Sequence, residues 1–215
     1  MMEIGAPNIE GPGGQVTFSN DVLKIDICGP EQEHLSVVDV PGIFRKKTEG
    51  QTTDQDKIMV KSMVESYMQN HRSVILTIVP ANTDIATQDI TETAERYDKE
   101  GVRTLGVLTK PDLVDEGGEN AVLDVLNGNK HGLKLGWCVV KNPGQKALND
   151  DSFDRYESER TFFLSEHPWS GLSPEQTGIE ALRNRLVGIL GDMIEREFPK
   201  VLPLLNAGVV QETDV

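Results

Sequence analysis

Three short runs of strand-type residues, separated by helical segments, constrain the fold of this chain most strongly. The runs span residues 73–80, 102–108 and 135–140, and Val, Ile and Leu dominate them. Such runs are typical of strands that are covered on both faces. Helical spacing predicts helices over 54–71, 86–99 and 120–126. This alternation of strands and helices predicts an α/β fold with a doubly wound, mostly parallel sheet.

Two more strands are predicted near the amino end. Residues 22–28 alternate between apolar and polar types, and residues 35–40 form a second apolar run after a Gly29-Pro30 turn. Because the connection is short, we expect the two strands to be antiparallel neighbours. Cys28 and Cys138 both lie in strand-like runs, which predicts buried free thiols.

The carboxyl end is predicted to be helical. A helix is expected over 153–164, and a strongly amphipathic helix from Ile179 to about Pro199. The chain therefore divides into a loop or disordered tail (1–18), an α/β domain (19–170) and a carboxyl-terminal helical segment (171–215).

The charge balance excludes some classes of partner. The formal net charge is −14, whereas nucleic-acid binding depends on clustered Lys and Arg. The same charge disfavours docking on anionic lipid. It does not exclude a nucleotide, because local groups can hold phosphates whatever the overall charge. No apolar run approaches the ~20 residues of a membrane span, and the chain start has no secretory-signal pattern, so we expect a cytoplasmic chain.

The first candidate motif is Asp39-Val40-Pro41-Gly42, after the second predicted strand. Ligands of α/β sheets bind beyond the carboxyl ends of strands. Asp39 there could hold a Mg²⁺-bound water, and Gly42 would let a backbone N–H approach a γ-phosphate. The alternative is an ordinary tight turn.

The second motif, Thr109-Lys110-Pro111-Asp112, follows the strand predicted over 102–108. The carboxylate of Asp112 can accept hydrogen bonds from two guanine nitrogens, a pair that adenine does not offer. The Lys110 stem can lie along the base, and Thr109 can brace the loop. Alternatively, this is a turn that caps a helix, with Asp115 as a second cap.

The third motif is Val139-Val140-Lys141-Asn142-Pro143-Gly144-Gln145, again after a predicted buried strand. It would support the other edge of the base, although an Asn-Pro-Gly turn is the alternative. The three motifs occur in the order expected of a guanine-nucleotide fold, each after a predicted strand, and together they favour that fold over three separate turns.

The sequence resembles the dynamin superfamily, and within it the Mx-like and fungal members. The resemblance runs from about Phe18 to Leu205. It is carried by these stretches, given by residue number: 35–44 (LSVVDVPGIF), 79–89 (VPANTDIATQD), 108–115 (LTKPDLVD), 159–163 (ERTFF) before His167-Pro168, and 202–205 (LPLL).

The resemblance implies roles for individual residues. Asp39 and Gly42 match the switch region that senses the γ-phosphate through Mg²⁺. Lys110, Asp112 and Asp115 match the guanine- and ribose-side contacts, and Asn142 and Gln145 match the base-supporting loop. Asp84 matches a residue presented to a second GTPase domain, with a local turn as the alternative.

The resemblance also implies an activity and partners. The family hydrolyses GTP with Mg²⁺, and hydrolysis is stimulated when GTPase domains pair in homo-oligomers. It uses this activity to remodel membranes, through regions outside this domain, or to assemble antiviral and organelle-dividing polymers. Its fold is the P-loop NTPase-like α/β type. The alternative is a nucleotide-free pseudo-GTPase that serves as an interaction module. The intact guanine motif favours a GTPase severed from its flanking segments.

One expected element is absent from the sequence. The chain contains no Gly-Lys dipeptide, so a G-x-x-x-x-G-K-[ST] loop does not occur in it. We therefore expect the central first strand, the phosphate loop and the switch threonine to be missing, and we assign no catalytic residue. A hydrogen bond to a charged group contributes ~1.5–3 kcal/mol, whereas association costs an estimated ~4–15 kcal/mol. The guanine half-site alone should bind GTP no better than ~mM, so we expect no bound GTP or GDP and no working GTPase.

Overall fold

A computed structural model describes residues 23–30, 36–40, 54–150 and 152–211. The chain divides into two compact units, residues 1–32 with 37–69 and residues 33–36 with 70–215. In the first unit the described helix is α1 (Asp54–Met68), close to the prediction. Its buried residues Val60, Val64 and Met68 recur every four positions, so they share one helix face.

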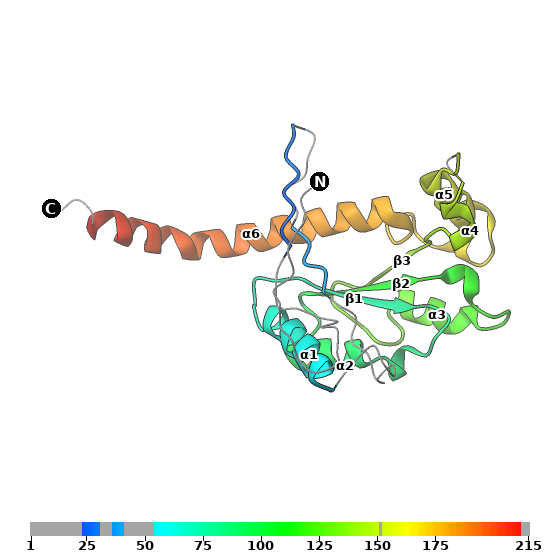
Figure 1. The fold of residues 1–215 in the computed structure, drawn as a ribbon, viewed down its shortest axis with the longest axis horizontal. Coiled ribbons are helices and arrows are strands. Elements are labelled where there is room, and N and C mark those ends of the chain that lie inside the picture. The colour runs from blue at the N-terminus through cyan, green and yellow to red at the C-terminus, as the bar shows by residue number, and fades with distance from the viewer. Residues whose placement is uncertain (1–22, 31–35, 41–53, 151, 212–215) are drawn as a thin grey trace, which may run out of the picture. The chain divides into compact units, whose positions relative to one another are not determined.

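The second unit is built on a three-stranded sheet (Figure 1). Its strands are β1 (Ile75–Pro80), β2 (Thr104–Thr109) and β3 (Trp137–Val140), in the order β1-β2-β3. Both pairings are parallel, with Ile75 opposite Thr104 and Gly106 opposite Trp137. The predicted α/β class and parallel sheet are confirmed.

Helices cover both faces of this sheet (Figure 1). On one face lie α2 (Asp89–Tyr97) and α3 (Glu119–Leu126), and their apolar side chains pack with Val79, Leu108 and Val139. On the other face the first turns of α6 (Gly178–Gln211) place Leu182 and Leu186 against Leu105, Val107 and Cys138. The near-continuous apolar runs of the strands therefore reflect burial on both faces.

Short elements connect these layers. They are the 3-10 turns η1 (Ile85–Thr87), η2 (Pro111–Leu113) and η3 (Trp169–Gly171), and the helices α4 (Gln145–Leu148) and α5 (Arg155–Ser165). Asp154 starts α5 because its carboxylate accepts hydrogen bonds from the backbone N–H of Tyr156 and Glu157, at 2.9 and 3.0 Å. The predicted helix over 153–164 is confirmed.

The two predicted amino-proximal strands are not observed. Residues 23–30 and 36–40, the described parts of those segments, contain no strand, and so no antiparallel pair is found there. Leu23, Ile25 and Ile27 are each more than 70% exposed, and Cys28 is exposed, which contradicts its predicted burial. A segment with alternating polarity forms a strand only when a neighbouring strand pairs with its backbone by hydrogen bonds. The described residues contain no such neighbour for these segments.

The last helix is longer than predicted. We expected it to end near Pro199, but α6 continues through Pro199 and Pro203 to Gln211. A proline removes one hydrogen bond and bends a helix, but it does not end a helix that good helix formers continue on both sides. Leu202 follows Pro199, and Leu204, Leu205 and Ala207 follow Pro203.

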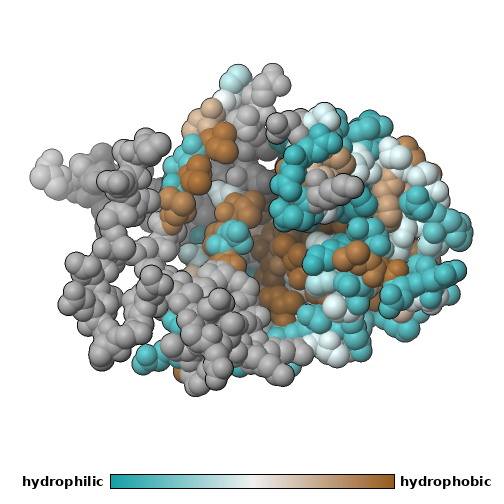
Figure 2. Space-filling view, turned by 45° about the vertical axis from the view of Figure 1, so that its right-hand side comes forward, coloured by the Kyte–Doolittle hydropathy of each residue, from teal (hydrophilic) through white to brown (hydrophobic). Residues whose placement is uncertain are grey.

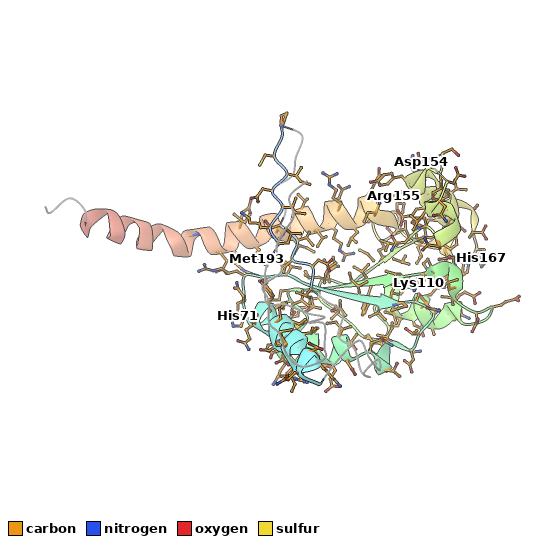
Figure 3. The ribbon with its side chains drawn as sticks, in the orientation of Figure 1. His71, Lys110, Asp154, Arg155, His167 and Met193 are labelled. Atoms are coloured by element: carbon orange, nitrogen blue, oxygen red, sulfur yellow. The ribbon has the colours of Figure 1, made fainter. Side chains whose placement is uncertain are left out.

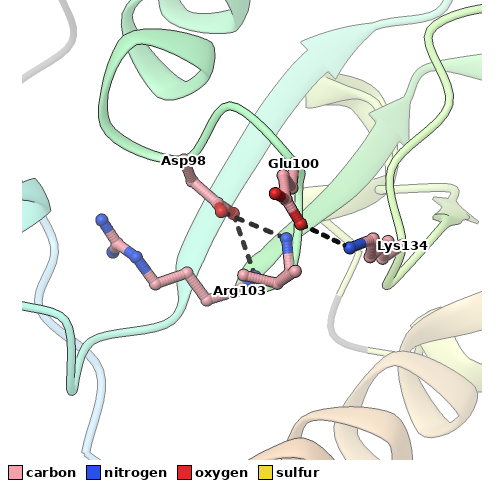
Figure 4. Close-up of polar contacts among 5 residues, drawn as sticks. Asp98, Glu100, Arg103 and Lys134 are labelled. Carbon is pink, nitrogen blue, oxygen red and sulfur yellow. Dashed lines mark hydrogen bonds and ion pairs between the residues drawn. The ribbon is translucent and has the colours of Figure 1, made fainter.

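The amino ends of the strands are held by a polar network (Figure 4). The buried carboxylate of Asp98 accepts hydrogen bonds from Val102 N–H, Arg103 N–H and the Thr104 hydroxyl, at 3.1, 2.9 and 2.6 Å. The Arg103 guanidinium donates to the carbonyls of Ser73 and Tyr97, both at 3.0 Å. The chain segments before β1 and β2 are thereby fixed to each other.

The described surface mixes polar and apolar areas, and hydrophobic patches are visible in Figure 2. Exposed apolar residues include Ile78 on β1 and Ile194 on α6. Among the described residues, no helix combines the length and the apolar character that crossing a bilayer requires.

Candidate nucleotide-binding site

The carboxyl ends of all three strands lie at one edge of the sheet. In the register, Pro80 of β1 is opposite Thr109 of β2, and Thr109 is opposite Val140 of β3. The loops that begin at Ala81, Lys110 and Lys141 therefore leave the sheet side by side. Two of these loops are the second and third predicted motifs, and the other carries Asp84.

The loop after β2 has a constrained backbone. Thr109 is half-buried, and its carbonyl accepts a 2.7 Å hydrogen bond from Ala81 N–H, which joins the first two loops. Lys110 at the end of β2 (Figure 3) adopts the left-handed conformation, with φ 57° and ψ 47°. Pro111 is buried and begins η2, whereas Asp112 in the same turn is exposed. A bulky residue with positive φ is uncommon and is often found at functional sites.

The segment after η2 contains Asp115, which is exposed. Its carbonyl accepts a 2.8 Å hydrogen bond from Gly118 N–H, closing a turn before α3. Thus the backbone of Asp115 shapes the turn and leaves its carboxylate at the surface.

The loop after β3 is held by α5. Lys141 N–H donates to the carboxylate of Glu159 at 2.8 Å, and the Lys141 ammonium lies 5.4 Å from the centre of the Phe162 ring. Asn142 is exposed in this loop, and Gln145, also exposed, begins α4. The first residue of the loop, Lys141, is therefore fixed, whereas the side chains of Asn142 and Gln145 further along the loop face solvent.

Asp84 lies in the loop after β1. One carboxylate oxygen accepts a 3.0 Å hydrogen bond from Ala86 N–H and caps η1. This is the local turn that we considered as the alternative, and the side chain stays exposed. Its role toward a second GTPase domain stays a prediction.

Several side chains at this edge are available to a ligand. Within the described part of the chain, Lys110, Asp112, Asn142 and Gln145 make no side-chain hydrogen bond or ion pair. The set combines an anion, a cation and two amides, which suits the edges of a nucleobase better than a phosphate or a metal.

The first motif is not placed with the others. Asp39 belongs to the first compact unit, where it is exposed and outside any helix or strand. Its predicted place at the end of a strand is therefore wrong. Gly42 lies outside the described residues. The same sheet edge carries residues 109–115, Asn142, Gln145 and the loop with Asp84. No described contact brings Asp39 to this edge.

Our sequence interpretation missed the role of Glu159 in this site. Glu159 is buried on α5, where both carboxylate oxygens accept backbone hydrogen bonds. The available signal in the sequence was its spacing from Phe163, because residues four apart share a helix face. In the structure both side chains are buried. An acidic residue on the apolar face of a helix indicates a specific partner.

The described hollows do not coincide with the three loops. One hollow of about 890 Å³ lies between α5 and the start of α6, lined by Tyr156, Phe163 and Ile179 among others. None of Lys110, Asp112, Asn142 and Gln145 lines it.

A parallel α/β sheet with polar loops at the carboxyl ends of adjacent strands is the architecture of a nucleotide-binding α/β domain. Two family models match the chain, "Dynamin family" over residues 3–111 and "Dynamin central region" over residues 121–211. The chain belongs to the dynamin family.

Similar curated proteins agree with this assignment. The interferon-induced GTP-binding protein Mx of Epinephelus coioides is 34% identical over 195 residues, which are 89% of this chain and 31% of that protein. Human interferon-induced GTP-binding protein Mx2 is 33% identical over 97% of this chain and 28% of its own length. The Mx2 protein of Bos taurus is 36% identical over 73% of this chain and 22% of its own length. The chain therefore spans less than a third of each of these relatives.

Proposed function

We propose that this chain is the guanine-reading part of a dynamin-type GTPase domain, in which the loops 109–115 and 141–145 bind the base of GTP or GDP. The observation that supports this most is the parallel register, which sets both loops at one edge of the sheet. The left-handed backbone at Lys110 adds to it, because the turn exposes Asp112 directly beside the sheet.

The chemistry of base recognition follows from the side chains. Asp112 accepts hydrogen bonds from the N1–H and the N2 amino group of guanine, and adenine cannot supply this pair. The aliphatic stem of Lys110 covers a face of the base. Asn142 and Gln145 contact the opposite edge, and Asp115 lies on the ribose side.

The phosphate side of the site would use Asp39 and Gly42. Mg²⁺ is usually bound through one or two carboxylates together with water and phosphate oxygens. The exposed carboxylate of Asp39 fits one such position, directly or through water. The described residues hold no cluster of three His, Cys, Asp or Glu that could form a metal site by themselves. Water and phosphate oxygens of the nucleotide would supply further ligands, and Mg²⁺ would neutralise phosphate charge.

The affinity of this chain for a nucleotide should be low. Charge-assisted hydrogen bonds at Asp112 contribute ~1.5–3 kcal/mol each, whereas the freedom lost on association costs an estimated ~4–15 kcal/mol. We expect an affinity no better than a ~mM dissociation constant, and no GTP hydrolysis by this chain. In the intact protein we propose GTP hydrolysis in a cytoplasmic homo-oligomer that remodels membranes, with Asp84 facing a second GTPase domain.

A competition titration tests guanine recognition. The chain, at up to millimolar concentration and with Mg²⁺, is titrated into a fluorescent GTP analogue, and excess GDP or ATP is then added. We expect GDP to displace the analogue and ATP not to. Asp112→Ala should abolish binding, whereas Asp192→Ala, which removes an exposed aspartate on α6, should not.

Equal displacement by ATP and GDP would contradict guanine recognition. So would binding that Asp112→Ala leaves unchanged, because the nucleotide would then be held elsewhere.

A further inference from the structure

Glu159 on α5 joins two segments that are far apart in the sequence. Its side chain is buried, with a relative exposure of 7%. One oxygen, Oε1, accepts a 2.8 Å hydrogen bond from Lys141 N–H, the first residue of the base loop. The other, Oε2, accepts a 2.9 Å hydrogen bond from Ile179 N–H, in the first turn of α6. One carboxylate thus bridges the loop after β3 and the start of the last helix.

Both segments need a carboxylate at this position. A buried charge is costly unless hydrogen bonds satisfy it, and the two backbone N–H groups do so. In the described residues no Lys, Arg or His forms an ion pair with Glu159. A glutamine has the same shape but only one acceptor, and its amino group would face an N–H donor. The bridge therefore depends on the charge and on both oxygens.

The backbone at the start of α6 fits closely around this carboxylate. Gly178 has φ +84°, and a Cβ there would lie 3.3 Å from Glu159 Oε2. Only glycine adopts this conformation without strain and leaves this space. Next to it, Val139 N–H donates to the Gln176 carbonyl at 2.8 Å, which continues the pairing of β3. Two interactions therefore hold residues 176–179 next to the end of β3: the bridge through the Glu159 carboxylate and the backbone hydrogen bond between Val139 and Gln176.

The side chain of Lys141 is held by the same helix. Its ammonium lies 5.4 Å from the centre of the Phe162 ring, a cation–π geometry. Phe162 packs edge-on against Phe163, with the ring centres 5.2 Å apart. Thus α5 fixes both the backbone and the side chain of the residue from which the base loop leaves the sheet.

We propose that Glu159 is a positioning residue for the base loop and the connection through which the loop and α6 affect each other. This inference depends on the proposed guanine site. Glu159 sets where Asn142 and Gln145 stand relative to the loop after β2. Because Oε2 holds Ile179, a shift of the first turn of α6 moves the same carboxylate, and an ordered base loop in turn holds the start of α6.

The test compares Glu159→Gln with Glu157→Gln, which makes the same chemical change at an exposed position of α5. The first measurement is amide hydrogen exchange without nucleotide. In Glu159→Gln we expect exchange at Lys141 and Ile179 to be faster by about tenfold or more, which corresponds to one lost charge-assisted hydrogen bond. Exchange in β2 should stay as in the unmodified chain, and Glu157→Gln should change neither position.

The second measurement uses GDP at millimolar concentration. In the unmodified chain, GDP should slow exchange at Ile179 as well as at Lys141, although Ile179 is not in a base-binding loop. In Glu159→Gln the effect at Ile179 should disappear, and the affinity for GDP should fall by about tenfold.

Unchanged exchange at both amides in Glu159→Gln would overturn the proposal. Faster exchange with full affinity for GDP would also overturn it, since Glu159 would then only support the fold. Faster exchange throughout β2 would also overturn the proposal, because it would indicate that the whole sheet is destabilised. If the unmodified chain binds no GDP, the proposed guanine site fails, but local acceleration at Lys141 and Ile179 still supports their connection through Glu159.

Discussion

The indole ring of Trp137 on β3 occupies the space beside Gly106 on β2. A Cβ at position 106 would lie 2.1 Å from Cε3 of Trp137, closer than any two carbon atoms can approach without a bond. Trp137 is only 2% exposed and its Nε1–H donates to the His131 carbonyl at 2.8 Å, so the ring is held in place.

Gly106→Ala should therefore destabilise the chain. We expect the free energy of unfolding, measured by urea denaturation, to fall by about 1–3 kcal/mol because the core is overpacked. The control is Gly188→Ala on α6, where a Cβ meets nothing within 4 Å. It should raise stability by about 0.5–1 kcal/mol, since alanine favours a helix. Equal effects at the two glycines would contradict the packing of Trp137 on β2.

Asp98 should make the stability depend on pH. Burial raises the pKa of Asp98, but hydrogen bonds from Thr104, Arg103 and Val102 and the charge of Arg103 outweigh burial, so its pKa lies below the usual value. The unfolded chain then binds the proton more tightly. The stabilisation by Asp98 is thus fully present above the unfolded pKa of about 3.9 and is lost as pH falls through the folded pKa.

Asp98→Asn tests this expectation. At pH 7 it should lower the free energy of unfolding by about 2–3 kcal/mol, and the difference should shrink as the pH falls below about 4. The control is Glu100→Gln, which breaks the exposed 2.7 Å ion pair with Lys134 (Figure 4). Exposed pairs contribute little, so this change should be small at every pH. A pH-independent difference for Asp98→Asn would contradict the lowered pKa.

At Lys110 we expect a trade-off between stability and nucleotide binding. The left-handed backbone lowers stability, whereas the side chain contributes to guanine binding. Lys110→Gly relieves strain at φ 57° and should raise the free energy of unfolding by about 1 kcal/mol, while it weakens guanine binding by removing the stem that covers the base. His131→Gly is the matched control, because His131 has φ 48° but lies in none of the three loops. It should raise stability without changing binding. Loss of stability in both variants would show that this strain is absent.

Asp154 should stabilise α5 through its cap. Asp154→Ala removes the acceptor of two backbone hydrogen bonds and should cost about 1 kcal/mol in the free energy of unfolding. Asp154→Asn keeps an acceptor oxygen and should cost little. Circular dichroism during urea unfolding measures both, and equal costs would contradict capping by the side-chain oxygen.

The sequence was sufficient to predict the sheet core and the loops that follow it. Runs such as 102–108 are apolar because both faces are buried, a condition that leaves a local signature. The motifs at Thr109 and Lys141 could be located because parallel strands place their carboxyl ends at one edge. The roles of their side chains stay predictions.

Other features depend on contacts between residues that are distant in the sequence, and a local sequence pattern does not reveal such contacts. The alternation at 22–28 resembles a strand, yet it cannot reveal whether a partner strand is present. Pro199 predicts a helix end, yet α6 continues to Gln211 because its neighbours favour a helix. Glu159 was recognised only as part of a family-like run, since its partners Lys141 and Ile179 are distant in sequence.

The most direct test of guanine recognition is residue-resolved NMR of the ¹⁵N-labelled chain during titration with GDP and, separately, ADP. We predict that GDP at millimolar concentration shifts the amide signals of residues 109–115 and 141–145, that ADP does not, and that Asp112→Ala removes the response. Shifts located elsewhere, equal shifts with ADP, or an unchanged response in Asp112→Ala would contradict a guanine site at the carboxyl edge of this sheet.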